Sequence, residues 1–197
     1  MENILDKIEA EDVIENELLE NYKKENCSFD KITINKAKLT NVDLTSSNFY
    51  KNTFRNVEFN NCNFSNSVFD NSTFIRCKFN NCKFTGCNLI ECILNNINFN
   101  ESNMNYINYC FSNFESVAFN DTILRNSRFQ ENEFKKVIFS DVDLTQAQFF
   151  MTSLNKVNLS SCNIEGIAVT PEDIKGAVIS QFQAVDLLYL LGVKVED

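Results

Sequence analysis

The chain has 197 residues, of which 44% are hydrophobic and 23% are charged, and it is long enough to bury the core of one domain. Its 27 acidic and 18 basic residues give a formal net charge of −9. It has no histidine, no Gly-rich phosphate loop, no G-x-S-x-G elbow and no apolar run of membrane-spanning length, so the usual signatures of catalysis and membrane insertion are missing.

The first 25 residues predict an amphipathic helix. They contain nine acidic and three basic residues, and their apolar residues recur at roughly helical spacing. We therefore expect residues 1–25 to form an N-terminal helical cap with its acids in solvent. The apolar positions are Ile4, Leu5, Ile8, Ile14, Leu18, Leu19 and Tyr22.

A large apolar residue then recurs at every fifth position from Phe29 to Ile164, in 28 consecutive units. A period of five fits neither an α-helix, with 3.6 residues per turn, nor a strand whose faces alternate. The chain must bend at each unit, and short extended pieces joined by bends stack best as coils that share backbone hydrogen bonds. Slim residues two positions earlier form a second inward column.

The large column is expected to form the core, with Phe64, Phe79, Phe84 and Phe99 among its members. The chain has only four glycines and one proline, so its bends must come from Asn, Asp and Ser. Every acidic residue of the repeat falls on an outward column, where nothing tunes a catalytic pKa. We therefore expect a protein that is not an enzyme.

Units such as Cys62-Asn63-Phe64-Ser65-Asn66 resemble the A(D/N)LXX motif of the pentapeptide-repeat family. The resemblance covers residues 26–166. It implies an all-β solenoid, a right-handed quadrilateral β-helix with four units per coil, so 28 units predict about seven coils. With about 4.8 Å between stacked strands, such a rod is roughly 34 Å long.

Seven of the eight cysteines occupy the slim inward column. Four of them, from Cys77 to Cys92, would lie on different walls and could not converge on one zinc ion, so we expect no metal and no cofactor. Cys62 and Cys82 stack one coil apart, close enough for a disulfide, but a reducing cytoplasm favours free thiols. Cys110 alone is expected to face outward and react.

Charge divides unevenly along the chain. Residues 26–165 carry 13 acidic and 13 basic residues, so the repeat itself is formally neutral. On a 20-residue coil, Glu101, Asp121 and Asp141 stack into an acidic edge, which is either a binding edge or a solvated surface. A neighbouring basic wall carries six cations against Glu115 and Glu133 and has a net charge of +4: Lys36, Arg55, Arg76, Lys135, Lys136 and Lys156.

Two other outward features have the same 20-residue spacing. Asparagines at 60, 80, 100 and 120 predict an amide ladder, with those at 41, 61 and 81 beside it. An apolar patch is expected on another wall, covered either by a partner or by the chain's own tail. It consists of Ile90, Phe111, Phe150 and Met151, together with Cys110.

Residues 167–197 predict a helical dimerisation segment. Thr170-Pro171 begins a helix with a threonine N-cap, and a second helix runs from Gln181 to Leu191 and stops at Gly192. The second helix has too many apolar residues for one buried stripe, so we expect it to pair with its own copy. The expected dimer interface is Phe182, Val185, Leu188, Tyr189 and Leu191.

The run from Gln183-Ala184 through the leucines to Leu191-Gly192 also resembles the C-terminal dimerisation tail of the Qnr-type quinolone-resistance branch of the family. That resemblance implies a DNA mimic that binds DNA gyrase or another topoisomerase. The neutral rod and its basic wall favour a cytoplasmic, dimeric protein-interaction scaffold without direct contact to nucleic acid, membrane or small-molecule substrates. Both hypotheses remain open at this point.

Overall fold

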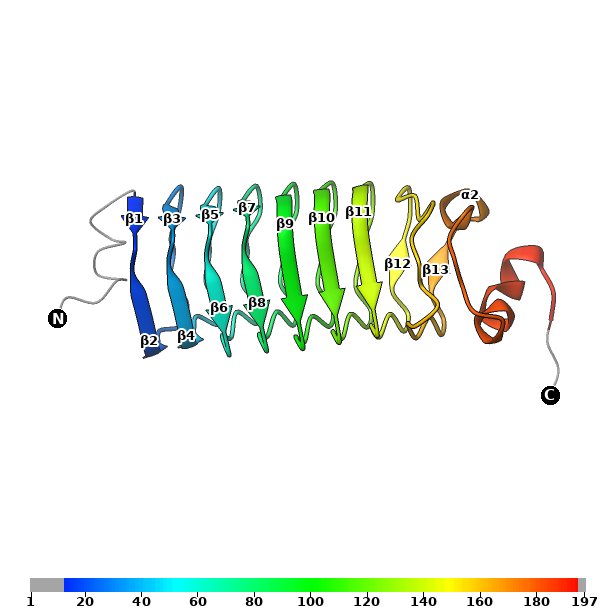
Figure 1. Ribbon diagram of the computed structural model, residues 1–197, viewed down its shortest axis with the longest axis horizontal. Helices are drawn as coiled ribbons and strands as arrows, with labels where there is room; N and C mark the ends of the chain where they lie inside the picture. Colours follow the sequence, from blue (N-terminus) through cyan, green and yellow to red (C-terminus); the bar gives the residue numbers. More distant parts are fainter. Residues whose placement is uncertain (1–12, 195–197) are drawn as a thin grey trace.

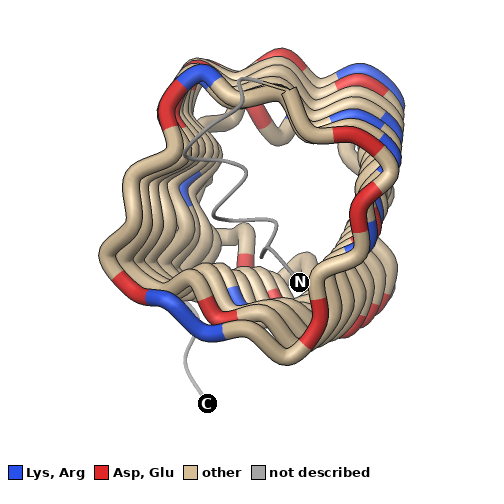
Figure 2. The backbone as a smooth tube through the Cα atoms, turned by 90° about the vertical axis from the view of Figure 1, so that its left-hand side faces the viewer, with Lys and Arg blue, Asp and Glu red and all other residues tan. Residues whose placement is uncertain are grey.

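The structure is a computed structural model that describes residues 13–194. Figure 1 shows a rod of stacked coils, and the end-on view in Figure 2 shows its four-sided outline. Residues 20 positions apart pair in parallel, as Thr33 does with Thr53 and Thr53 with Thr73. The predicted β-solenoid is confirmed, with about eight coils where about seven were expected.

We number the four walls in chain order by their inward residues in one coil, Phe49, Phe54, Phe59 and Phe64. Walls 2 and 3 carry one 11-stranded parallel sheet. On wall 2 lie β1 (Val13–Glu15), β3 (Thr33–Asn35), β5 (Thr53–Arg55) and β7 (Thr73–Ile75). On wall 3 lie β2 (Leu18–Lys23), β4 (Lys38–Asp43), β6 (Glu58–Asn60) and β8 (Lys78–Asn80).

Three longer strands run through the corner between walls 2 and 3 and belong to both: β9 (Ile93–Asn100), β10 (Asn113–Asn120) and β11 (Glu133–Ser140). Walls 1 and 4 are joined mainly by single bridges, such as Ser28 to Asn48 and Asp43 to Asn63. A short pair on wall 1, β12 (Gln148–Phe149) and β13 (Ala168–Val169), lies near the C-terminal end.

One backbone conformation makes the bends. The second residue after each inward large residue has a positive φ, between 50° and 66°, at 28 non-glycine positions. This left-handed region is costly for most residues and is best tolerated by Asn and Asp. Asn, Asp and Ser hold 15 of the 28 positions, as the composition predicted, but lysines, glutamates and Tyr106 also adopt the conformation.

Aromatic stacking between coils fills the interior. Phe59 and Phe79 stack with ring centroids 4.6 Å apart, and Phe79 and Phe99 with centroids 4.8 Å apart. Neighbouring walls meet edge to face, as Phe79 and Phe84 do at 5.3 Å. The residues expected in the core lie there: Phe64, Phe79, Phe84 and Phe99 are all 2% exposed or less.

The N-terminal helix expected over residues 1–25 is wrong for the part of that segment that the structure describes. β1 and β2 pair with β3 and β4 and form an additional coil. Ile14 and Leu19, which are 2% and 6% exposed, extend the inward column backward. These two residues are five apart, which fits the repeat of the solenoid. The edge of the next coil offers backbone hydrogen-bond partners to this segment, so strands form here in place of a helix. Residues 1–12 of the expected helix lie outside the described residues.

The C-terminal segment contains both expected helices. α2 (Pro171–Ile174) begins with Thr170, whose side chain accepts a bond from the Asp173 N–H at 3.1 Å. The second helix, η1 (Phe182–Leu191), is a 3-10 helix that ends at Gly192 with a φ of 69°. Its three-residue turn puts different side chains on one face than a 3.6-residue turn would.

Replacing Phe79 with Asp should break the stack, because a charge would replace a ring that four other rings contact. We expect a loss of at least about 4 kcal/mol in unfolding free energy. The matched control is Phe111→Asp, at an outward position that is 48% exposed, with an expected change below about 1 kcal/mol. Thermal melts followed by circular dichroism measure both, and equal losses would contradict the assignment of inward and outward columns.

Candidate interaction surfaces

The cysteines line the interior and form no reactive site. All eight are free and buried. Burial raises the pKa of Cys77 to about 11 and the pKa values of Cys87 and Cys92 to about 12. Among residues 13–194, no group of three or more acidic or cysteine side chains could hold a metal ion. The same part of the chain contains no helix long and apolar enough to cross a membrane.

Cys110 lies on an outward column, as expected, but it is buried. Its side chain is 8% exposed, and its thiol lies 2.8 Å from Oδ1 of Asn108. Burial raises the pKa of this thiol as well. Ile90 and Gln130 occupy the same column position in the adjoining coils.

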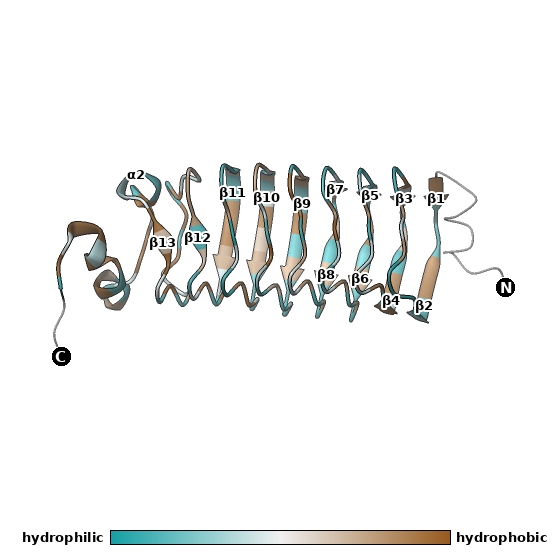
Figure 3. Ribbon diagram, turned by 180° about the vertical axis from the view of Figure 1, so that it is seen from behind, coloured by the Kyte–Doolittle hydropathy of each residue, from teal (hydrophilic) through white to brown (hydrophobic). Residues whose placement is uncertain are grey.

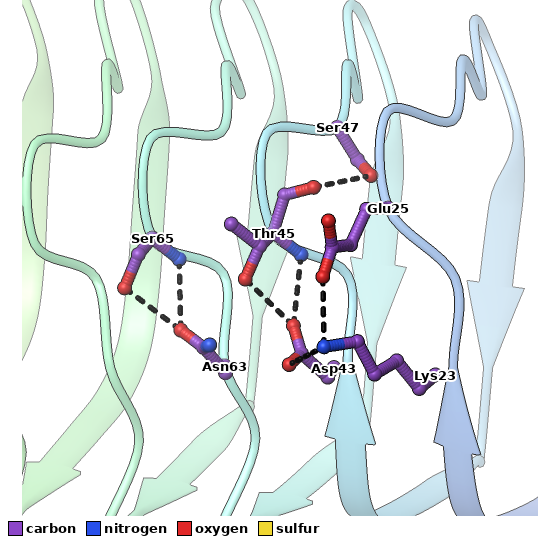
Figure 4. Close-up of polar contacts among 7 residues, drawn as sticks. All are labelled: Lys23, Glu25, Asp43, Thr45, Ser47, Asn63 and Ser65. Atoms are coloured by element: carbon purple, nitrogen blue, oxygen red, sulfur yellow. Dashed lines mark hydrogen bonds and ion pairs between the residues drawn. The ribbon is translucent and has the colours of Figure 1, made fainter.

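Polar side chains on the walls are largely used to join coils or support bends. Figure 4 shows Asn63, whose Oδ1 accepts bonds from the backbone N–H and hydroxyl of Ser65 at 3.1 and 2.7 Å. Asp43 accepts the same two bonds from Thr45 and lies 3.6 Å from Nζ of Lys23. Burial alone would raise the pKa of Asp43, but the Thr45 bonds and the Lys23 charge outweigh it and lower that pKa.

Two asparagine ladders follow the corner between walls 3 and 4. In the first, each Nδ2 donates to Oδ1 one coil earlier, at 2.8 to 2.9 Å: Asn80 to Asn60, Asn100 to Asn80 and Asn120 to Asn100. In the second, the same bonds measure 2.9 to 3.2 Å: Asn41 to Asn21, Asn61 to Asn41 and Asn81 to Asn61. The predicted ladders are confirmed, and because their amides bond to one another they are structural elements.

The acidic edge continues the second ladder. Glu101, Asp121 and Asp141 take the next three positions of that column, all are exposed, and all have a φ of 50° to 53°. Because β10 pairs with β11 in register, Asp121 and Asp141 lie at the same corner of adjacent coils. None of the three makes an ion pair with a described residue. The structure thus brings this predicted set together.

The apolar patch is not continuous. Phe111, Phe150 and Met151 are 48%, 39% and 69% exposed, and Ile90 is half-buried. The coil between Phe111 and Met151, however, presents Gln130 and Glu131 on the same two columns. The structure therefore brings Phe150 and Met151 together but separates them from Ile90 and Phe111.

The basic wall is partly neutralised. Lys135 forms an ion pair with Glu115, and Nε of Arg76 donates to Oδ1 of Asn56 at 2.7 Å. Lys136 and Lys156 make no ion pair with any residue in the described part of the chain. Lys36, Arg55 and Arg76 also make no ion pair that the described structure shows, so unpaired positive charge runs along this wall, and Lys136 and Lys156 are its members in the C-terminal half of the rod.

The C-terminal helix closes the last coil with one face. The side-chain amide of Gln183 is buried and donates to the carbonyls of Leu159 and Cys162 at 2.8 and 2.7 Å. The Tyr189 hydroxyl donates to the Ile167 carbonyl at 2.7 Å. The sequence analysis missed this capping role, for which the polar Gln183 in an apolar helix was the available signal.

The other face of η1 is apolar and exposed. Figure 3 colours much of this helix as hydrophobic. Phe182 and Leu191 are 81% and 76% exposed, Val185 is 54% exposed and Tyr189 is 48% exposed. Leu188 is half-buried. All five residues expected at the dimer interface are therefore at least partly accessible at the end of the rod.

We expect none of the thiols to react rapidly in the folded protein, because all eight are buried, including Cys62, whose pKa is lowered by its hydrogen bond with Cys82. A group with a pKa of about 11, such as the thiol of Cys77, is only about 0.1% ionised at pH 8, and the thiolate is the reactive form. Titration with dithionitrobenzoate should detect no rapid thiol under native conditions and all eight in concentrated guanidinium chloride. One rapidly reacting native thiol, lost in Cys110→Ser, would show that Cys110 is accessible.

The family model described as "Pentapeptide repeat region" matches residues 32–109, 52–129 and 112–189. No curated protein matches the chain.

Three solved structures are similar at low identity. A trypsin-treated form of QnrB1, a plasmid-mediated fluoroquinolone resistance protein, is 16% identical with a TM-score of 0.46, covering 94% of this chain and all of its own. HetL, involved in heterocyst differentiation regulation in the cyanobacterium Nostoc sp. strain PCC 7120, is 15% identical with a TM-score of 0.28, covering 90% of this chain and 96% of its own. Rfr23 from the cyanobacterium Cyanothece 51142 is 14% identical with a TM-score of 0.32, covering 89% and 97%.

Proposed function

Because the chain belongs to the pentapeptide-repeat family, we propose that it acts as a non-catalytic, dimeric scaffold that binds other proteins. The observation that carries the proposal is the exposed apolar face of η1 at the C-terminal end of the rod. The walls of the joined rods would then present the binding surfaces.

The capping of the last coil does not require this apolar face. Gln183 and Tyr189 satisfy backbone carbonyls of the rod, and Leu187 and Leu190 pack against its core. Phe182 and Leu191 point elsewhere, and burying each would contribute about 1.5–3 kcal/mol. A two-fold contact between two copies buries the same patch on both, which is the simplest way to cover it.

A non-catalytic role agrees with the use of the polar groups. Asn63, Asp43 and the two asparagine ladders bond within the solenoid, so these side chains are committed to its structure. Eight free thiols suit a reducing compartment, which supports a cytoplasmic location.

Replacing Phe182 and Leu191 together with Glu should convert the dimer to a monomer, because four buried charges would face one another across the two-fold contact. Sedimentation velocity measures this, with an expected halving of the mass. Met151→Glu is the control, since Met151 is 69% exposed on the side of the rod and should leave the dimer intact. A wild-type protein that sediments as a monomer at high concentration would refute the dimer.

A DNA mimic that binds gyrase is the second candidate. The acidic edge favours it, because Glu101, Asp121 and Asp141 are exposed, stacked and unpaired with any described residue. The tail sequence that resembles the Qnr-type branch favours it as well. Against it stands the formal neutrality of residues 26–165.

Mimicry would act through charge, so it should weaken as salt rises. Gyrase supercoiling and quinolone-dependent cleavage, titrated with the protein at two salt concentrations, test this. Inhibition or drug protection that weakens as salt rises supports the mimic. The effect should also fall at least about five-fold in the double variant Glu101→Gln, Asp121→Asn. Glu131→Gln on wall 1 is the control. No effect at excess protein would exclude gyrase.

A further inference from the structure

The parallel sheet of walls 2 and 3 ends before the rod does. β11 pairs with β10 on one side, and on its other side it pairs with no described strand or bridge. The chain nevertheless makes a further coil there, and residues 154 and 159 of that coil are fully buried in the same inward columns. Two walls of the rod are therefore interrupted at this step.

The missing bonds can be identified from earlier coils. There, Asn56 N–H donates to the Ile75 carbonyl at 2.9 Å, and Lys78 N–H donates to the Val57 carbonyl at 3.0 Å. The equivalent bonds, from Lys136 to residue 155 and from residue 158 to Val137, do not occur in the described structure. The ladder resumes one coil later, where Lys156 N–H donates to the Gly176 carbonyl at 2.9 Å.

Walls 4 and 1 stay closed at the same level. Leu144 N–H donates to the Asn163 carbonyl and Phe129 N–H to the Gln148 carbonyl, at 2.8 and 2.7 Å. The gap is thus a slit along walls 2 and 3, while the backbone bonds of walls 4 and 1 hold the following coil in place.

The slit coincides with a change of shape at the corner between walls 2 and 3. β11 passes through the corner between walls 2 and 3 as a continuous strand. In the next coil the same corner is a tight turn, in which Val157 N–H donates to the Leu154 carbonyl at 2.9 Å. The bonds on both adjoining walls are absent at this step.

The slit opens onto the core. Val137 is 8% exposed whereas Val117, one coil earlier in the same column, is 1% exposed. Phe134 is half-buried whereas Phe114 is 1% exposed. A groove of about 300 Å³ lies here, lined by Phe134, Lys136, Val137, Asn155, Lys156 and Val157.

The groove combines an apolar floor, free backbone groups and positive charge. Lys136 and Lys156 occupy the same corner position of adjacent coils and flank the groove, and neither is ion-paired with a described residue. Ile138, beside them on wall 3, is 57% exposed. β11 contains one acidic residue, Glu133, which is the first residue of the strand.

We propose that this slit is a docking site for an extended acidic segment of a partner protein. The segment's backbone would pair with the free edge of β11, its apolar side chains would cover Phe134 and Val137, and its carboxylates would lie beside Lys136 and Lys156. A strand edge above an apolar floor suits a peptide, whereas a nucleic acid would need a longer row of cations. The inference rests on the proposed scaffold function and names one binding site for it.

Hydrogen exchange tests the slit directly. The amide of Lys136 faces the gap, whereas that of Ser116, in the same corner one coil earlier, belongs to a strand paired on both sides. We expect the Lys136 amide to exchange at least about 100-fold faster than the Ser116 amide. Equal protection of the two amides would overturn the proposal, because the edge of β11 would then be closed.

Binding is tested with a defined probe, a fluorescein-labelled octapeptide of alternating Val and Glu with blocked ends. We expect saturable binding that slows exchange at Lys136 at least ten-fold and weakens at least ten-fold in Lys136→Glu with Lys156→Glu. Lys36→Glu is the matched control, since Lys36 has the same corner position and the same left-handed φ where the ladder is intact. Equal binding of a Val and Lys peptide, or no loss in the double variant, would refute the site.

Sedimentation of the same variants separates this inference from the proposed function. Lys136 and Lys156 lie on the side of the rod, away from η1, so the double variant should remain dimeric. Loss of peptide binding with an intact dimer supports the slit as the site. A dimer that does not bind the probe would refute the slit as a docking site and leave the scaffold proposal unaffected.

Discussion

The structure depends on one repeated interaction, the backbone hydrogen bond between adjacent coils. Along most of the rod, an inward residue and the second residue after it donate to the next coil, as Phe49 does to the Val68 carbonyl and Lys51 to the Asp70 carbonyl. The left-handed conformation at every fifth residue turns the chain so that these donors line up. Each coil contains left-handed residues that cost free energy, and its hydrogen bonds to the neighbouring coils offset that cost. The net free energy is therefore favourable only while coils stack.

The same geometry explains why cysteine, serine and threonine replace one another in the slim column. A donor at this position reaches the carbonyl 23 residues earlier, as Ser72 does to Phe49 at 2.7 Å, Cys87 to Phe64 at 2.8 Å and Thr152 to Phe129 at 2.8 Å. A small donor in this column can therefore satisfy a carbonyl of the preceding coil, although apolar residues such as Ala37 and Val57 occupy the same column elsewhere. This accounts for most of the cysteine content without metal binding or catalysis, because six of the seven inward thiols donate to a backbone carbonyl of the solenoid.

Periodicity predicted the core, the bends and the asparagine ladders, because all three follow from spacing alone. It missed what spacing does not encode. Lys24 interrupts the inward column, so the first coil resembled a separate amphipathic segment, although Ile14 and Leu19 keep the register. The interval of five runs unbroken from Phe134 to Leu154, so nothing in it reveals the altered corner, which depends on the local backbone conformation of residues 154–157.

Unsatisfied groups in such a protein should occur where repetition stops, since each interior coil satisfies its neighbours. The described rod has two such places in its C-terminal half: the face of η1 that carries Phe182, and the open edge of β11. The acidic edge differs, because it lies on an unbroken stack of coils and its charges are already solvated. Ion pairs with a partner there would replace bonds to water and gain little. A free strand edge above an apolar floor gains more from a partner, since pairing satisfies backbone groups and removes apolar surface from water at the same time.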